Sequence, residues 1–276
     1  MKPRRVQKAI STVLLTALII SGCARNQQIV DHSVSSLESE LGSAIHQQIL
    51  HSVPVYPEQT LNAYVQDVGA RIASHADRKM DYRFVVLEDE RIYATFAPGG
   101  YVYVTTGFFR FLQNEIELAG ILAYEIAALQ YKDPRLSRLK KSLDFVLRTG
   151  SYVAPAFGAI GALSIIGFAL VDAAASGQKS ILQRAQDADR KALQYLYASE
   201  YDPQGLIDSL YRMSDIHSPY RAYLYDYLQS HPIDVDRMNR VNDAFEKLPL
   251  ENRDFEAGRL QFLNKTEIVR GTFTRK

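Results

Sequence analysis

The sequence is poor in sulfur ligands and has almost no net charge. Its 276 residues include one cysteine, Cys23, which excludes a disulfide within the chain and a cysteine-based metal site. The 32 basic and 31 acidic residues leave a formal net charge of +1. A chain balanced in this way gives no reason to expect nucleic acid as a partner.

Apolar residues, in contrast, are plentiful. They make up 47% of the chain, which is enough to bury a core and argues against a disordered protein. The length fits one good-sized domain, or one domain with extensions. The sequence therefore predicts a folded protein whose chemistry must come from side chains other than cysteine.

The N-terminus has the pattern of a secretion signal. Basic residues between positions 2 and 8 precede an apolar run over residues 9–20. The following Ile20-Ser21-Gly22-Cys23 resembles the lipobox of bacterial lipoproteins. That resemblance implies a signal peptide over residues 1–22, cleavage before Cys23 and acylation of Cys23 with lipid. A signal anchor with an incidental cysteine is the alternative.

A lipid on Cys23 would anchor the mature protein to a membrane, because each buried CH2 contributes about 0.8 kcal/mol. Ala24 follows the cysteine, where aspartate would signal retention in the inner membrane of a Gram-negative cell. We therefore expect an outer-membrane lipoprotein that faces the periplasm. Residues 23–56 are expected to form a lipidated tether and an N-terminal helix.

The periodicity of apolar residues in the mature chain predicts an α+β fold, mainly helical with a small sheet. Helices are expected over residues 57–76, 108–112, 114–130, 181–197, 206–213 and 235–245, and strands over 82–87, 92–96 and 101–105. Ala97-Pro98-Gly99-Gly100 indicates a turn between the last two strands. Residues 57–245 are expected to form the main domain.

Two further segments are less regular. Residues 152–171 form an apolar stretch without a charge, which is long enough to cross a bilayer. Its proline and glycines favour a buried or membrane-facing helix, and a transmembrane span is the alternative. Residues 246–276 are expected to be a polar tail, of which residues 267–270 favour a β-strand.

The predicted helix over residues 114–130 is the centre of the sequence. Asn114 and Glu117 have the spacing of a capping box, in which each side chain bonds to a backbone N–H near the helix start. Ile116, Ile121 and Ile126 supply apolar positions at roughly helical spacing.

Five segments in order resemble one family of zinc peptidases. They are residues 93–107 (YATFAPGGYVYVTTG), 114–119 (NEIELA), 187–189 (DAD), 201–205 (YDPQG) and 230–232 (SHP). Together they are similar to the HtpX- and BepA-like gluzincin zinc endopeptidases, relatives of the CAAX prenyl proteases. The resemblance covers about residues 60–240 and implies a zincin-like fold.

The resemblance also locates the positions of the family's metal ligands, and in this chain they hold poor ligands. The two histidines of H-E-x-x-H fall on Tyr124 and Ala128, and the third ligand, a glutamate, falls on Ala185. Only the general base is retained, as Glu125. Without three protein ligands zinc is not held and its water is not activated. We therefore expect no cofactor and no hydrolysis by the family's mechanism.

Other residues take roles in the resemblance as well. Asp189 matches an aspartate that orients the first zinc histidine, and His231 matches a histidine that approaches the site. We hypothesise a hydrogen bond from the Tyr124 hydroxyl to the Asp189 carboxylate. Glu125 is expected to be a relic of the site or a partner of Arg184 or His231. An alternative metal site would have to use His231, His217, Asp187, Asp189 and Glu125.

The resemblance favours a membrane-anchored pseudoprotease of the bacterial envelope. Such a protein would bind protein segments in the former active-site groove as a chaperone, adaptor or regulator, possibly beside an active relative. The peptide would pair with an exposed strand edge formed by residues Tyr101, Val102, Tyr103, Val104 and Thr105. The alternatives are an active metalloendopeptidase of envelope quality control with non-standard zinc ligands and a purely structural lipoprotein.

Overall fold

The structure is a computed structural model that describes residues 36–130, 181–250, 255 and 258–271. Cys23, the predicted signal peptide and the apolar stretch 152–171 lie outside the described residues. Among the residues that are described, no helix combines the length and the apolarity needed to cross a membrane.

A sheet of three short strands forms one layer of the fold. The strands are β1 (Arg83–Leu87), β2 (Ala94–Ala97) and β3 (Tyr101–Thr105), arranged in the order β1-β3-β2. The central strand β3 runs parallel to β1 and antiparallel to β2. The predicted turn between β2 and β3 is confirmed, since Gly99 and Gly100 adopt φ angles of +81° and +95°, which favour glycine.

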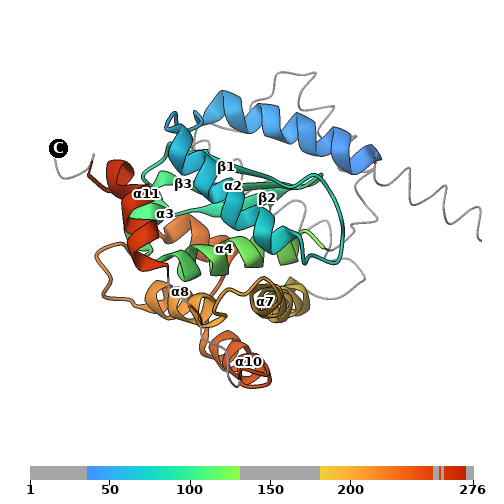
Figure 1. Ribbon diagram of the computed structural model, residues 1–276, viewed down its shortest axis with the longest axis vertical. Helices are drawn as coiled ribbons and strands as arrows, with labels where there is room; N and C mark the ends of the chain where they lie inside the picture. The colour runs from blue at the N-terminus through green and yellow to red at the C-terminus, as the bar shows by residue number, and fades with distance from the viewer. Residues whose placement is uncertain (1–35, 131–180, 251–254, 256–257, 272–276) are drawn as a thin grey trace, which may run out of the picture.

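Helices cover both faces of the sheet (Figure 1). On one face lies the helix over residues 36–52, where His46 stacks on Tyr101 with the ring centroids 4.5 Å apart and meets the Tyr103 hydroxyl at 3.0 Å. On the other face lie α2 (Gln59–Ala73) and α4 (Glu115–Ala128). Since successive side chains of a strand point to opposite faces, β3 contributes to both interfaces.

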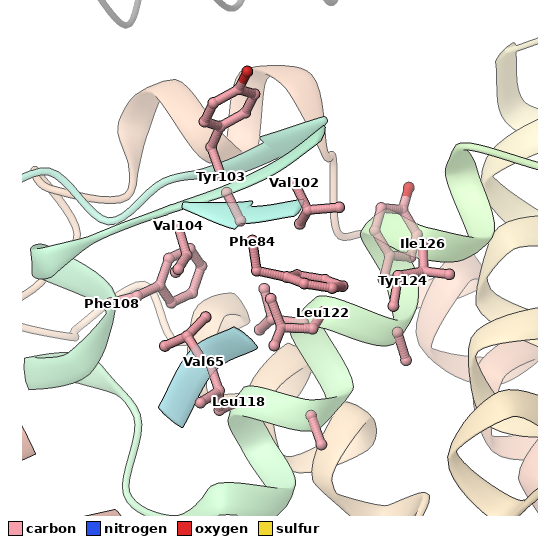
Figure 2. Packing of buried hydrophobic residues seen from close by; sticks show 14 of the residues in the cluster. Val65, Phe84, Val102, Tyr103, Val104, Phe108, Leu118, Leu122, Tyr124 and Ile126 are labelled. Atoms are coloured by element: carbon pink, nitrogen blue, oxygen red, sulfur yellow. The ribbon is translucent and has the colours of Figure 1, made fainter. Parts of the chain in front are cut away.

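Figure 2 shows the core between the sheet and α4. Phe84, Val102 and Val104 point from the strands toward Leu118 and Leu122 of α4, and Tyr103 points the other way. All of these side chains are almost fully shielded from solvent. α4 is thus buried nearly all round, which explains why its sequence is apolar on every face.

The predicted N-terminal cap of α4 is confirmed in part. The side chain of Asn114 accepts a hydrogen bond from the backbone N–H of Glu117 at 2.9 Å. The carboxylate of Glu117 does not return to Asn114 among the contacts that the structure gives. It accepts instead from the backbone N–H of Gln113, also at 2.9 Å, and pairs with the guanidinium of Arg212.

Further helices lie on the side of α4 that is turned away from the sheet (Figure 1). α7 (Ile181–Ala198) and α8 (Gln204–Ser214) pack on α4, and α10 (Val235–Phe245) packs on α7 and α8. In α9 (Tyr225–Ser230), the ring of Tyr227 meets Tyr93 and Phe108 edge to face. α8 crosses α4 closely, because a Cβ added at Gly205 would lie 2.1 Å from the carbonyl oxygen of Ile116. α4 therefore sits in the middle of the molecule, between the sheet and these helices.

The prediction of a β-prone polar tail is wrong for residues 267–270. They belong to α11 (Arg259–Gly271), which packs against α3 (Thr106–Phe111). Phe262, Thr266 and Val269 lie at helical spacing and are 0%, 0% and 2% exposed. Their burial outweighs the local β preference of Ile268-Val269.

Candidate functional site

The positions of the predicted zinc ligands lie on two helices that pack against each other. α4 carries Tyr124, Glu125 and Ala128, and α7 carries Ala185. Tyr124 is 6% exposed and Glu125 is fully buried, whereas Ala128 and Ala185 are only partly buried. The expected positions therefore lie on two helices that are in contact.

A buried ion pair is the strongest interaction in this region. The guanidinium of Arg237 on α10 donates from Nε and Nη2 to the two carboxylate oxygens of Asp189 on α7, at 2.9 and 2.8 Å. Nη1 donates to the carbonyl oxygen of Pro232 at 3.1 Å. Arg237 is 5% exposed and Asp189 is 3% exposed, so solvent screens this pair very little.

The planar fork of the guanidinium explains why an arginine can be buried here, because it satisfies both oxygens of the carboxylate at once. Burial alone lowers the pKa of Arg237, but the neighbouring Asp189 carboxylate and the Tyr124 hydroxyl outweigh burial and leave that pKa raised. Arg237 therefore stays charged.

Tyr124 connects α4 to this ion pair through its ring. The guanidinium carbon of Arg237 lies 4.9 Å from the centroid of the Tyr124 ring, within the range of a cation–π contact. The imidazole of His231 meets the same ring edge to face, with the centroids 5.5 Å apart. The expected hydrogen bond from Tyr124 to Asp189 stays a prediction, but both carboxylate oxygens already accept from Arg237.

Glu125 and His231 form a second buried pair. Nε2 of His231 lies 3.6 Å from Oε1 of Glu125, beyond normal hydrogen-bond length, and among the described residues neither oxygen of Glu125 has a hydrogen-bond partner. The imidazole stacks on Tyr227 with the centroids 4.2 Å apart, and its Nδ1 meets the hydroxyl of Ser230 at 2.9 Å. His231 is thus held in place from the side opposite Glu125.

Burial favours the neutral forms of both groups. It raises the pKa of Glu125 to about 8, against the opposing charge of Arg237. Burial and the charge of Arg237 together lower the pKa of His231 to about 3. Near neutral pH the pair is therefore a carboxylic acid beside a neutral imidazole, and a protonated Glu125 cannot accept a proton from water.

The residues of this region do not fit a zinc ion. A catalytic zinc site needs three protein ligands from histidine, glutamate, aspartate or cysteine. No group of three such residues is arranged to hold a metal within the described part of the chain. The alternative set of His231, His217, Asp187, Asp189 and Glu125 is therefore not assembled, and Asp189 is occupied by Arg237.

The prediction that β3 offers a free edge for a peptide is wrong. Residues 101–105 do form a strand, as their alternation predicts, but alternation does not fix the order of strands in a sheet. β3 lies between β1 and β2, so both of its edges are paired, and all five of its residues are buried. In the order β1-β3-β2, the outer edge of the sheet on the antiparallel side is an edge of β2.

The outer edge of β2 is formed by the backbone of Ala94 and Phe96. The N–H of Thr105 donates to the carbonyl of Tyr93, so in the alternating antiparallel pattern the peptide groups of Ala94 and Phe96 face away from β3. Ala94 is fully buried and Phe96 is only partly buried. Phe96 is therefore the accessible point of this edge.

Arg237 is the residue of this region that the sequence did not reveal. The helix over residues 235–245 was predicted, but it contains two arginines, and spacing alone does not show which of them is buried. In the fold Arg237 is the buried one, because its backbone N–H donates to the capping carboxylate of Asp234 and its side chain faces α7. His231 and Asp189, in contrast, were singled out by the resemblance and do lie in the site.

Comparison with known proteins agrees with the resemblance seen in the motifs. The model of peptidase family M48 matches residues 59–244, which is more than half of the chain. The beta-barrel assembly-enhancing protease of Escherichia coli K12 is 24% identical over 253 residues, which cover 86% of this chain and 50% of that protein. The protein of the same name in Yersinia pestis is 26% identical and covers 82% and 48%.

A third relative is the putative beta-barrel assembly-enhancing protease of Vibrio cholerae, at 26% identity over 79% of this chain and 46% of that protein. The chain thus spans about half the length of the curated relatives it matches. The match of the family model establishes that the chain belongs to peptidase family M48. The α+β fold, mainly helical with a small sheet, is the one expected for this family.

The buried ion pair leads to a prediction about stability. Asp189→Asn leaves the Arg237 charge buried without a counter-ion, so we expect the free energy of unfolding to fall by about 3–5 kcal/mol. Asp187→Asn is the matched control, because its partner Arg190 is 59% exposed and such a pair contributes roughly 0–1 kcal/mol. Urea denaturation of both variants measures the difference, and equal small losses would contradict the assignment.

The neutral Glu125–His231 pair leads to a prediction about pH. The folded pKa of Glu125, about 8, lies above its ordinary 4.5, so its contribution to stability is lost as the pH rises from 4.5 to 8. The folded pKa of His231, about 3, lies below 6.5, so its contribution is lost as the pH falls from 6.5 to 3. Between pH 4.5 and 6.5 the two residues change the free energy of unfolding in opposite directions. We therefore expect this free energy to be nearly constant over that range.

Glu125→Gln removes the group that titrates on the alkaline side. We expect the variant to lose the fall in stability between pH 6.5 and 8 and to keep the acid-side fall. Unfolding free energies measured at several pH values test this, with Glu246→Gln on the exposed end of α10 as a control. A wild-type profile that matches Glu125→Gln above pH 6.5 would show that Glu125 is ionised in the native state.

Proposed function

From its membership of peptidase family M48, we infer that this protein is a pseudoprotease of the bacterial envelope, which binds protein segments without cutting them. The observation that carries this proposal is the chemistry of the buried region around α4. The residues at the zinc-ligand positions, Tyr124, Ala128 and Ala185, supply no imidazole and no carboxylate. Without a metal the pKa of the attacking water is not lowered toward neutrality, and the substrate carbonyl is not polarised.

The state of Glu125 supports the same conclusion. A general base must be ionised and within reach of a water molecule. Glu125 is fully buried, and burial raises its pKa to about 8, so it is protonated near neutral pH. The position of the family's catalytic glutamate thus still holds a glutamate, Glu125. Its carboxyl group is protonated near neutral pH, whereas hydrolysis requires a carboxylate.

We place the protein at the outer membrane, facing the periplasm, with a lipid on Cys23 as its anchor to the membrane. The lipobox-like sequence before Cys23 supports the anchor. The relatives from Escherichia coli, Yersinia pestis and Vibrio cholerae carry the name of beta-barrel assembly-enhancing proteases, which supports an envelope protein as the client. The role would be that of a chaperone, adaptor or regulator, possibly beside an active relative.

A client segment would bind where the edge of the sheet can be reached. An extended peptide adds to a sheet through backbone hydrogen bonds, and its side chains provide specificity. Among the described residues no strand pairs with the outer edge of β2. At Phe96 the peptide group faces away from β3 and the side chain is partly exposed, which supports an addition there. Ala94 is fully buried, so binding along the rest of β2 would require the residues that bury Ala94 to move.

One observation favours the alternative of an active metalloendopeptidase with non-standard ligands. His231 lies 3.6 Å from Glu125, so the two side chains are close enough to bind one cation together if Glu125 were to ionise. Two ligands fall short of the three that catalytic zinc sites use. The inactive protein is therefore the better supported function.

A cleavage assay separates these two functions. We expect β-casein incubated with the protein and added zinc to remain intact, at the level seen with Glu125→Gln. An active enzyme would instead lose about 100-fold or more of its rate on that substitution, since the glutamate would be its general base. Cleavage by the wild type that disappears both in Glu125→Gln and with a zinc chelator would overturn the proposal.

A crosslinking experiment tests where the client binds. A photoreactive residue at Phe96 is expected to crosslink to unfolded envelope protein, because it marks the open edge of β2. The same group at Leu260, which is 79% exposed on α11, serves as the control for random encounter. Equal yields at the two positions would exclude the β2 edge as the binding surface.

A further inference from the structure

A cavity of about 450 Å³ lies between α7 and α10, on the surface formed by these two helices and the residues that follow α10. This volume is typical of pockets for small molecules, which measure roughly 300–1,000 Å³. The cavity is lined by Gln186, Asp187, Asp189, Arg190 and Gln194 from α7, by Arg240, Val241, Asp243 and Ala244 from α10, and by Lys247 and Leu248.

The lining combines an apolar floor with a polar wall. Val241 is 1% exposed, and Ala244 and Leu248 pack against the hydrophobic core. The polar wall carries two amides, Gln186 and Gln194, which can donate or accept hydrogen bonds. A ligand that fills this cavity would therefore have both an apolar and a polar part.

Arg240 is the group in the wall that most needs a partner. Its Nε atom is buried and, among the described residues, has no hydrogen-bond partner. No carboxylate of the described residues lies within 4.0 Å of its guanidinium, in contrast to Arg237 one turn earlier on the same helix. A buried donor without a partner destabilises the native state, and a bound acceptor would remove that cost.

The charges of the wall show which kind of acceptor fits. Asp187 is paired with Arg190 at 2.9 Å, and Asp189 is neutralised by Arg237. The charges that remain among the lining residues are those of Arg240, Lys247 and Asp243, a net charge of +1. Asp243 is exposed, so solvent can screen its charge. The Nε atom of Arg240 is buried, so solvent screens it much less. The cavity thus has an excess of one positive charge, located at Arg240.

We propose that this cavity binds a small organic monoanion, a carboxylate carried on a short apolar body. The carboxylate would accept hydrogen bonds from the Arg240 guanidinium, which suits a planar anion, with Lys247 at the rim. The apolar body would rest on Val241, Ala244 and Leu248. The C-terminal residue of a polypeptide and a free aliphatic acid both have this chemistry.

The cavity is separate from the buried pair of Glu125 and His231, neither of which lines it. It shares one residue with the ion pair, because Asp189 forms part of its wall. A ligand that bridges α7 and α10 stabilises the native state by RT ln(1 + L/Kd), where L is the free ligand concentration, so the stabilisation grows with the logarithm of the affinity. This site does not depend on the proposed binding of client segments or on the absence of hydrolysis.

Calorimetric titration of the full-length protein tests the proposal with matched probes. N-acetyl-leucine carries the carboxylate, and N-acetyl-leucinamide has the same apolar body without the charge. We expect saturable binding of the acid, and binding at least about tenfold weaker for the amide, because a hydrogen bond to a charged group is lost. Octanoate separates the two sources, since a preference for it over N-acetyl-leucine indicates an aliphatic acid and the reverse indicates a polypeptide end.

Variants then locate the site. Arg240→Gln is expected to weaken binding of the preferred acid about tenfold or more, and Leu248→Ser to weaken it without removing the preference for acid over amide. Arg221→Gln changes an arginine outside the cavity and is expected to have no effect. Absence of saturable binding of both acids, equal binding of acid and amide, or equal affinity of wild type and a folded Arg240→Gln would overturn the proposal.

Discussion

The buried ion pair between Asp189 and Arg237 is the interaction on which the arrangement of the helices depends. Burying either charge alone would cost several kcal/mol, so α7 and α10 are stable in their places only when the two side chains meet. The bidentate geometry fixes their orientation, and the ring of Tyr124 lies over the same guanidinium. Through these contacts one arginine connects α4, α7 and α10.

Burial determines which forms the neighbouring residues take. It favours neutral Glu125 against the charge of Arg237, and it favours neutral His231 together with that charge. A peptidase of this kind needs the opposite conditions, with an ionised glutamate and neutral histidines around a metal. The burial of this region thus opposes the ionised form of Glu125. For the pseudoprotease that we propose, the useful part would be the scaffold, including the sheet edge at Phe96.

The sequence predicted much of the fold because the signals are local. The alternation of residues 101–105, the cap at Asn114 and the stripes of α2 and α10 depend on neighbours in the chain. The place of β3 in the middle of the sheet depends on pairing with β1, which no local pattern encodes. The same holds for Arg237, which meets Asp189 across 48 residues, and for α11, whose helical form depends on burial against α3. In the site, the motifs located Asp189 and His231, while their partners became visible only in three dimensions.

The central claim is that the scaffold of a zinc peptidase is kept while its metal ligands are absent. The most direct measurement is the zinc content of the purified protein beside a variant that combines Tyr124→His, Ala128→His and Ala185→Glu. Our account predicts no stoichiometric zinc in the wild type and one zinc ion per chain in the variant, because the variant supplies three ligands from the two packed helices. Stoichiometric zinc in the wild type, or none in the folded variant, would contradict it.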